Sequence, residues 1–138
     1  RDDASMAAGR HIGIAWALTG IIRAVLFHAR ENKLLLPKSL LSEKDLGGHD
    51  VIRRKNAAKI GEVVSDIASV ARLHLDQARA LHAEVDPRAV PALLVGVLSE
   101  QYLKGLAKRR YDVFDPRHVM QRPSILGLTW KALRGRYC

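Results

Sequence analysis

The 138-residue sequence predicts an all-α protein, folded as a helical bundle. Apolar residues recur every three or four positions over long stretches, which is the spacing of one face of an α-helix. No stretch alternates apolar and polar residues as a strand would, and no segment repeats another. Hydrophobic residues make up 48% of the chain, so a chain of this length can form one domain with a buried core.

The first helix should run from about Asp3 to Arg30. Its uninterrupted apolar stretch, 12–22, is too short to cross a bilayer, so we interpret the helix as part of a buried core. Small residues recur along one face of it: Gly9, Gly13, Ala17 and Gly20. Such a stripe is typical of a place where another backbone comes close. We therefore expect tight packing there within the bundle, and overpacking in a Gly13→Leu variant.

The middle of the chain predicts short elements followed by the clearest helix. We expect a turn ending at Pro37, a short helical turn at 40–41 and a break at 47–48. From about Val51 to Glu84, one apolar stripe keeps helical spacing: Ile60, Val63, Val64, Ile67, Val70, Ala71, His74, Ala78 and Leu81. No histidine or carboxylate lies four residues from His74 on this stripe. We therefore interpret it as a hydrogen-bonded core histidine rather than a metal ligand.

The last part of the chain predicts two further helices. Asp86 as N-cap and Pro87 at the first helical position begin one of them. Its apolar residues are Val90, Leu93, Leu94, Val97, Leu98, Tyr102 and Leu106. An irregular basic link follows over 111–123. The final amphipathic helix, about 124–134, is expected to bury Ile125, Leu128, Trp130 or Leu133.

The net charge of +9 is concentrated near the C-terminal end. Residues 1–98 hold 14 Lys/Arg and 11 Asp/Glu, whereas residues 99–138 hold 9 and 3. A basic end can meet nucleic acid, an anionic membrane or an acidic protein, or it can simply be solvated. We expect no specific nucleic-acid binding, because aromatic residues are not interleaved with the charges.

The cysteine content and the start of the chain bear on the cellular compartment of the protein. Cys138 is the single cysteine, which excludes a disulfide framework and favours a reducing compartment. No signal-peptide pattern begins at Arg1, so we expect that a presequence was removed or that the sequence is a fragment.

The sequence carries no glycine-rich phosphate loop, Cys/His metal cluster or nucleophile elbow, so we expect no catalytic residue, metal or cofactor. A resemblance is present instead. The stretch HIGIAWALTGIIRAVLFHARENKLLLPKSLL resembles the second active-site helix of the squalene/phytoene synthases and the loop after it. In that family an arginine precedes two aspartates four residues apart, and a run ending in leucine-proline follows. Arg23 matches the arginine, and Leu36 and Pro37 match the end of the run.

The resemblance places Ala24 and His28 where the two aspartates would stand. Such aspartates share one helical face and hold Mg²⁺, which requires oxygen ligands, for binding prenyl diphosphates. Alanine offers no ligand, and imidazole suits softer metals. The family's upstream aspartate motif has no counterpart, since only Asp2 and Asp3 precede this helix. We therefore expect a pseudoenzyme.

One non-catalytic branch of the family, the mitochondrial complex I assembly factor 6 group, is more similar still. The similar stretches are AAGRHIGIA, RAVLFHAR, VVSDIASVARLHLDQARAL, AVPALL, YLKGL and YDVFDP, in the same order. The resemblance covers nearly all of residues 1–138 but only the C-terminal half of the family's domain. It implies an isoprenoid (trans-prenyltransferase) synthase-like fold and a role in assembling respiratory complex I, on the matrix side of the inner mitochondrial membrane.

Two other functions stay open: a permanent subunit of a large mitochondrial assembly (a respiratory complex or a mitoribosome), and half of a split prenyltransferase. The first helix is apolar around most of its circumference, and few other helices are available to cover it. We therefore expect an obligate protein partner, either the missing N-terminal half or a neighbouring subunit. Ile12, Trp16 and Leu26 should lie near that contact. The resemblance also allows a peripheral contact with the inner membrane.

Overall fold

The structure is a computed structural model that describes residues 2–119 and 121–138, a part of the chain that contains helices and no strand. The all-α prediction is therefore confirmed. The elements in order are α1 (Asp3–Arg30), α2 (Lys38–Glu43), α3 (Gly48–Ile52), α4 (Ala57–Ala80), the 3-10 turns η1 (His82–Glu84) and η2 (Pro87–Ala89), α5 (Val90–Leu93), α6 (Val95–Lys108), α7 (Pro116–Val119) and α8 (Ile125–Leu133).

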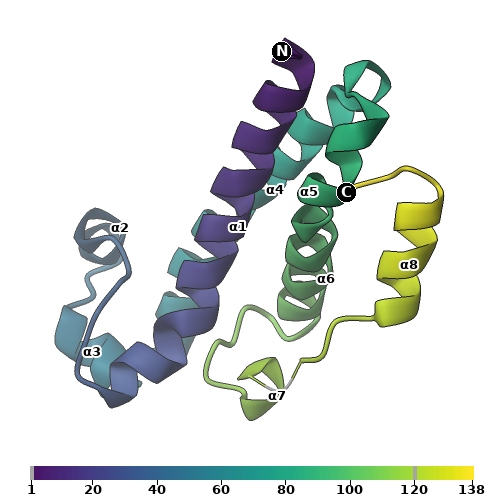
Figure 1. The fold of residues 1–138 in the computed structure, drawn as a ribbon. Helices are drawn as coiled ribbons and strands as arrows, with labels where there is room; N and C mark the ends of the chain where they lie inside the picture. The colour runs from purple at the N-terminus through teal and green to yellow at the C-terminus, as the bar shows by residue number, and fades with distance from the viewer. Residues whose placement is uncertain (1, 120) are drawn as a thin grey trace.

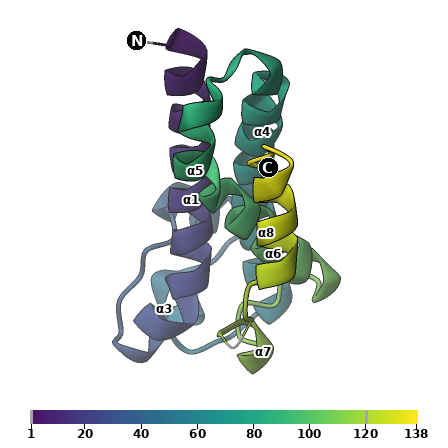
Figure 2. The same ribbon diagram turned by 45° about the vertical axis from the view of Figure 1, so that its right-hand side comes forward.

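Three helices form the core. α1 and α4 lie side by side and antiparallel, and α6 packs against both (Figures 1 and 2). The buried residues of α1 recur every three or four positions: Ala8, Ile12, Ala15, Thr19, Ile22, Val25, Leu26 and Ala29. α4 repeats the pattern with Ile60, Gly61, Val63, Val64, Ile67, Ala68, Ala71, Leu75 and Ala78. Small residues recur in both sets and let the two helices approach closely.

α1 has the bounds that the sequence predicts. Asp2 caps its first turn, because a carboxylate oxygen accepts a hydrogen bond from the backbone N–H of Ala4 at 3.1 Å. The whole helix, unlike its uninterrupted apolar stretch, is long and apolar enough to cross a membrane. Less than half of its most apolar part is buried here, and core helices of soluble proteins pass the same test.

The predicted helix over 51–84 is wrong at its start. α3 ends at Ile52, and α4 begins only at Ala57. Between them, Arg54 and Asn56 have φ angles of 54° and 57°, in the left-handed region that a continuous α-helix excludes. The expected break at 47–48 falls between α2 and α3, and α3 begins at Gly48, with the Gly47 N–H donating to the Asp50 carboxylate at 2.8 Å.

The predicted helix after Asp86 is divided in two. The Asp86 carboxylate accepts from the Arg88 N–H at 2.8 Å, so it caps the η2 turn rather than a long helix. The helical path is then interrupted at Leu94, between α5 and α6. The link over 111–123, expected to be irregular, contains α7.

The C-terminal segment differs most from the expectation. α8 forms where predicted, with the Ser124 hydroxyl accepting from the Gly127 N–H at 3.1 Å, but it has no buried residue. The core instead receives Tyr137, which is 1% exposed and donates its hydroxyl to the Ala78 carbonyl at 2.8 Å. Gly135 makes the intervening turn possible with a φ of 66°.

Candidate interaction surface on helix α1

One side of α1 is left largely uncovered by α4 and α6, although Trp16 and Arg23 at its edge line a pocket shared with α6. The exposed residues there, which we call the open face, are Gly13, Trp16, Ala17, Gly20, Arg23 and Phe27. Trp16 and Phe27 are 39% and 60% exposed. A Cβ atom built at Gly13 or Gly20 would meet no described atom within 4 Å. The open face therefore has small residues at its centre and aromatic residues beside them.

The prediction that this small-residue stripe packs inside the bundle is wrong. Of its three glycines, only Gly9 has a described neighbour, since a Cβ atom built there would lie 3.7 Å from Leu93 Cδ2, and the fourth member, Ala17, is exposed. The reason is geometric: α4 and α6 take up the buried side of α1, and no described helix is left for the other side. The predicted overpacking at Gly13 therefore does not apply within this chain.

The three residues expected near a partner have different positions. Trp16 lies on the open face, where a partner can reach it. Ile12 and Leu26 are only 2% and 4% exposed and belong to the chain's own core instead of an accessible contact. Periodicity identified an apolar helix, but it could not tell which of its apolar residues this chain buries itself.

A small pocket adjoins the open face. It has a volume of about 60 Å³ and is lined by Trp16, Arg23, Leu98, Gln101, Tyr102, Gln121 and Pro123. The guanidinium of Arg23 lies 5.5 Å from the centre of the Tyr102 ring, a cation–π contact between α1 and α6. Burial raises the pKa of Tyr102 to about 12, although the positive charges of Arg23 and Arg109 oppose this. The phenol is therefore neutral at physiological pH.

Ala24 and His28 lie one turn apart on α1, and both are half-buried. The Nδ1 atom of His28 is buried and has no hydrogen-bond partner in the described structure. Its ring meets Phe27 edge-on, with centroids 5.6 Å apart. Among the described residues, no group of three or more His, Cys, Asp or Glu side chains lies close enough to hold a metal ion. A metal here would need ligands from elsewhere.

The leucine-proline run after α1 has a structural place. Leu36 is buried in the core, whereas Pro37 is exposed and precedes the first residue of α2. The fixed φ of proline suits a position at which a helix begins. Arg23 lines the pocket beside the open face, whereas Leu36 and Pro37 are not among the residues that line it.

The hydrogen-bonded histidine expected at position 74 has a partner on another helix. His74 Nδ1 lies 2.9 Å from His11 Nδ1 on α1, so one ring donates and the other accepts. Both rings are half-buried beside an open hollow, and His74 is therefore less enclosed than a core residue. Sequence spacing could not find this pair, because 63 positions separate its members.

Several known proteins are similar to this chain in sequence. A family model described as squalene/phytoene synthase matches residues 1–124. A rat protein named NADH dehydrogenase (ubiquinone) complex I, assembly factor 6 is 34% identical over 122 residues, covering 88% of this chain and 36% of the relative. The human protein of that name is 34% identical over 121 residues, with the same two coverages. An assembly factor 6 homolog of Drosophila melanogaster is 27% identical over 133 residues, covering 94% and 40%.

The chain matches only part of the length of its relatives, which bears on what could cover the open face. The chain spans just over a third of the length of its rat and human relatives. No solved structure matches the chain. α8 lies beyond the residues that the family model matches.

Proposed function

This chain belongs to the squalene/phytoene synthase family, and from that premise we propose that it acts, without catalysing a reaction, in the assembly of mitochondrial respiratory complex I. The observation that carries the proposal is the 34% identity, over 88% of the chain, to relatives named for that role. We also propose a mitochondrial location, on the matrix side of the inner membrane.

The side chains at the metal-motif positions support the non-catalytic part of the proposal. Mg²⁺ takes oxygen ligands in octahedral geometry, and neither Ala24 nor His28 offers an oxygen. We propose that these residues replace the two aspartates of the family's second motif. The chain would then retain the fold of a prenyl synthase without the means to bind a diphosphate through magnesium.

We propose that the rest of the family fold, on the same polypeptide or on another, covers the open face of α1. Residues 1–138 would then be the C-terminal half-domain of that fold. Three observations support this occupant. The chain matches only 36% of the length of its relatives, Trp16 and Phe27 offer aromatic anchors, and Gly13 and Gly20 leave room for a close backbone. Such exposed apolar surface favours an obligate partner, with a neighbouring subunit as the alternative.

Complementation tests this function. Cells that lack the chain should accumulate incomplete complex I on native gels, and the wild-type chain should restore the mature complex. Phe27→Ser and Gly20→Leu, which alter only the open face, should fail to restore it. Lys59→Gln, at an exposed position on α4, is the matched control and should succeed.

Two results would contradict the proposal. Normal complex I assembly in the absence of the chain would remove the proposed role. Recovery of the chain in equal amounts with the mature complex, or with a mitoribosome, would show a permanent subunit rather than an assembly factor.

A further inference from the structure

Helix α8 turns its apolar side outwards. Ile125, Leu126, Trp130 and Leu133 are 73%, 85%, 58% and 79% exposed. The helical repeat places all four within an arc of about 140°, which we call the outer arc. Figure 1 shows α8 on the outer side of α6, on the side away from α1. A helix at the surface of a globular protein has the opposite orientation, with its apolar side against the core.

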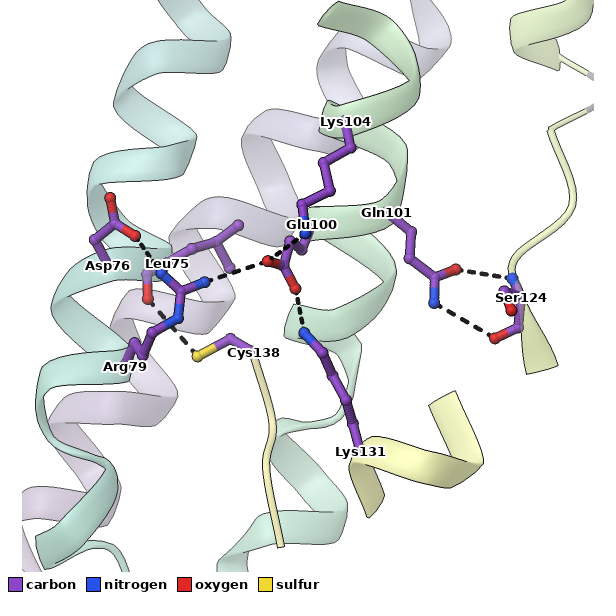
Figure 3. Close-up of polar contacts among 9 residues, drawn as sticks. All are labelled: Leu75, Asp76, Arg79, Glu100, Gln101, Lys104, Ser124, Lys131 and Cys138. Atoms are coloured by element: carbon purple, nitrogen blue, oxygen red, sulfur yellow. Dashed lines mark hydrogen bonds and ion pairs between the residues drawn. The ribbon is translucent and has the colours of Figure 1, made fainter. Parts of the chain in front are cut away.

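Polar contacts hold α8 in this orientation (Figure 3). On its inner side, the Lys131 ammonium donates to the Glu100 carboxylate of α6. At its first turn, the Ser124 N–H donates to Gln101 Oε1 at 2.8 Å, and Gln101 Nε2 donates to the Ser124 carbonyl at 3.4 Å. Because these contacts attach the polar side to α6, the outer arc cannot turn inwards without breaking them.

Glu100 is a strong anchor for Lys131. Its side chain is 16% exposed and also contacts the ammonium of Lys104 at 3.0 Å and the guanidinium of Arg79 at 3.4 Å. Burial tends to raise the pKa of Glu100, but hydrogen bonds from Lys131 and Lys104 hold it below its ordinary value. The carboxylate is therefore ionised at neutral pH, and the ion pair that orients α8 persists.

The charged side chains of the C-terminal segment have one sign. Residues 116–138 hold five Lys/Arg and no Asp/Glu. Arg122, Arg134 and Arg136 are exposed, and in the described part of the chain no ion pair joins them to a carboxylate. The Arg134 guanidinium lies 4.2 Å from the centre of the Trp130 ring. Free arginines beside an exposed tryptophan and leucines are typical of a helix that lies in the surface of an anionic membrane.

We propose that α8 binds the surface of a bilayer that contains anionic phospholipid. The outer arc enters the acyl region, and Arg122, Arg134 and Arg136 meet the lipid phosphates. A helix of nine residues offers limited apolar area, so both attractions are needed for stable binding. The inference rests on the proposed function only for which membrane is met, since the surface chemistry belongs to α8 itself.

Vesicle co-sedimentation tests this inference, with the chain purified together with any protein bound to it. The wild-type chain should sediment with vesicles of phosphatidylcholine and phosphatidylglycerol, and much less with phosphatidylcholine alone. Leu126→Ser/Leu133→Ser should weaken binding by at least about tenfold, because both side chains would be buried in lipid. Leu73→Ser removes an exposed apolar group from α4, where Leu73 is 56% exposed, and should leave binding unchanged.

A second pair of variants tests the charge. Arg134→Gln/Arg136→Gln should weaken binding to the anionic vesicles by about tenfold or more, and added salt should reduce the difference. Lys59→Gln/Lys108→Gln makes the same change in net charge at exposed positions on α4 and α6 and should have little effect. Circular dichroism should show equal helix content in all variants, since every altered side chain is exposed.

The inference is overturned if Leu126→Ser/Leu133→Ser binds anionic vesicles as the wild type does. It is also overturned if that variant keeps vesicle binding but releases a co-purifying protein, because the outer arc would then be a protein interface. A chain that supports complex I assembly without binding vesicles would refute this inference alone. Vesicle binding through α8 with normal complex I in cells that lack the chain would refute only the proposed function.

Discussion

Replacing Gly13 by alanine should stabilise the chain, whereas the same replacement at Gly96 should destabilise it. A methyl group at Gly13 meets no described atom within 4 Å, so the change gains helix propensity, about 1 kcal/mol, without a packing cost. At Gly96 the new Cβ would lie 2.5 Å from Ile12 Cδ1 and 2.7 Å from the backbone oxygen of Tyr137. Both neighbours belong to buried residues, and overpacking of this kind costs about 1–3 kcal/mol.

The two variants should therefore differ by about 2–4 kcal/mol in free energy of unfolding. The gain at Gly96 from helix propensity is smaller than at Gly13, because Gly96 lies in the first turn of α6. Urea unfolding followed by circular dichroism measures both values, with equal m-values showing that the same surface is exposed on unfolding. A clear loss of stability in Gly13→Ala would refute the claim that the side of α1 carrying Gly13 is uncovered. If Gly96→Ala left the free energy of unfolding unchanged, the close packing of Tyr137 against α6 would be refuted.

Three further predictions concern other contacts. His74→Ala should cost about 0.5–1.5 kcal/mol, and a double-mutant cycle with His11→Ala should show that the two losses are not additive; additive losses would mean that the pair does not interact. Burial raises the pKa of Tyr137 from 10 to about 12, so its contribution to stability is complete below pH 10 and is lost as the pH rises through 12. The stability advantage of the wild type over Tyr137→Phe should shrink across that range, and a constant difference would contradict the burial of the phenol. Finally, the purified chain should not condense farnesyl or geranylgeranyl diphosphate with Mg²⁺, because Ala24 and His28 supply no carboxylate; turnover would contradict this.

The long helices were predictable because periodicity reports burial. The bounds of α1 follow from its apolar pattern and the turn after Arg30. The start of α4 was not predictable, because Val51 continues the apolar pattern as part of the separate helix α3. Arg54 and Asn56 adopt left-handed backbone angles, yet neither is a glycine that would mark the break in the sequence.

Sequence patterns also do not say which side of a helix faces the protein. In α8 the pattern identifies an apolar side, and the usual rule places that side inwards. The ion pair between Lys131 and Glu100 reverses the orientation, and it joins residues 31 positions apart. Val70 on α4 illustrates the same limit, since it keeps the spacing of the apolar stripe but is exposed.

The candidate surface was predictable only in part. The stripe of small residues on α1 indicates that a backbone comes close, but not whether that backbone belongs to the same chain. Trp16 was identified as a contact residue, and Phe27, which is more exposed, was not. The family itself was recognisable from its resemblance, and the match of the family model to residues 1–124 confirms it. The assignment of Arg23, Leu36 and Pro37 to the family's motif stays a prediction.

The central claim, that the rest of a squalene/phytoene synthase fold covers the open face of α1, is tested most directly by photocrosslinking. A photoreactive phenylalanine analogue that replaces Phe27, which is 60% exposed, keeps an aromatic ring on the open face and leaves Gly13 and Gly20 unchanged. The same analogue at Lys59, exposed on α4, gives the background. We predict that position 27 crosslinks, in the native compartment, to one polypeptide segment carrying the remainder of the family fold. Crosslinks from position 27 no more frequent or specific than those from position 59 would contradict the claim.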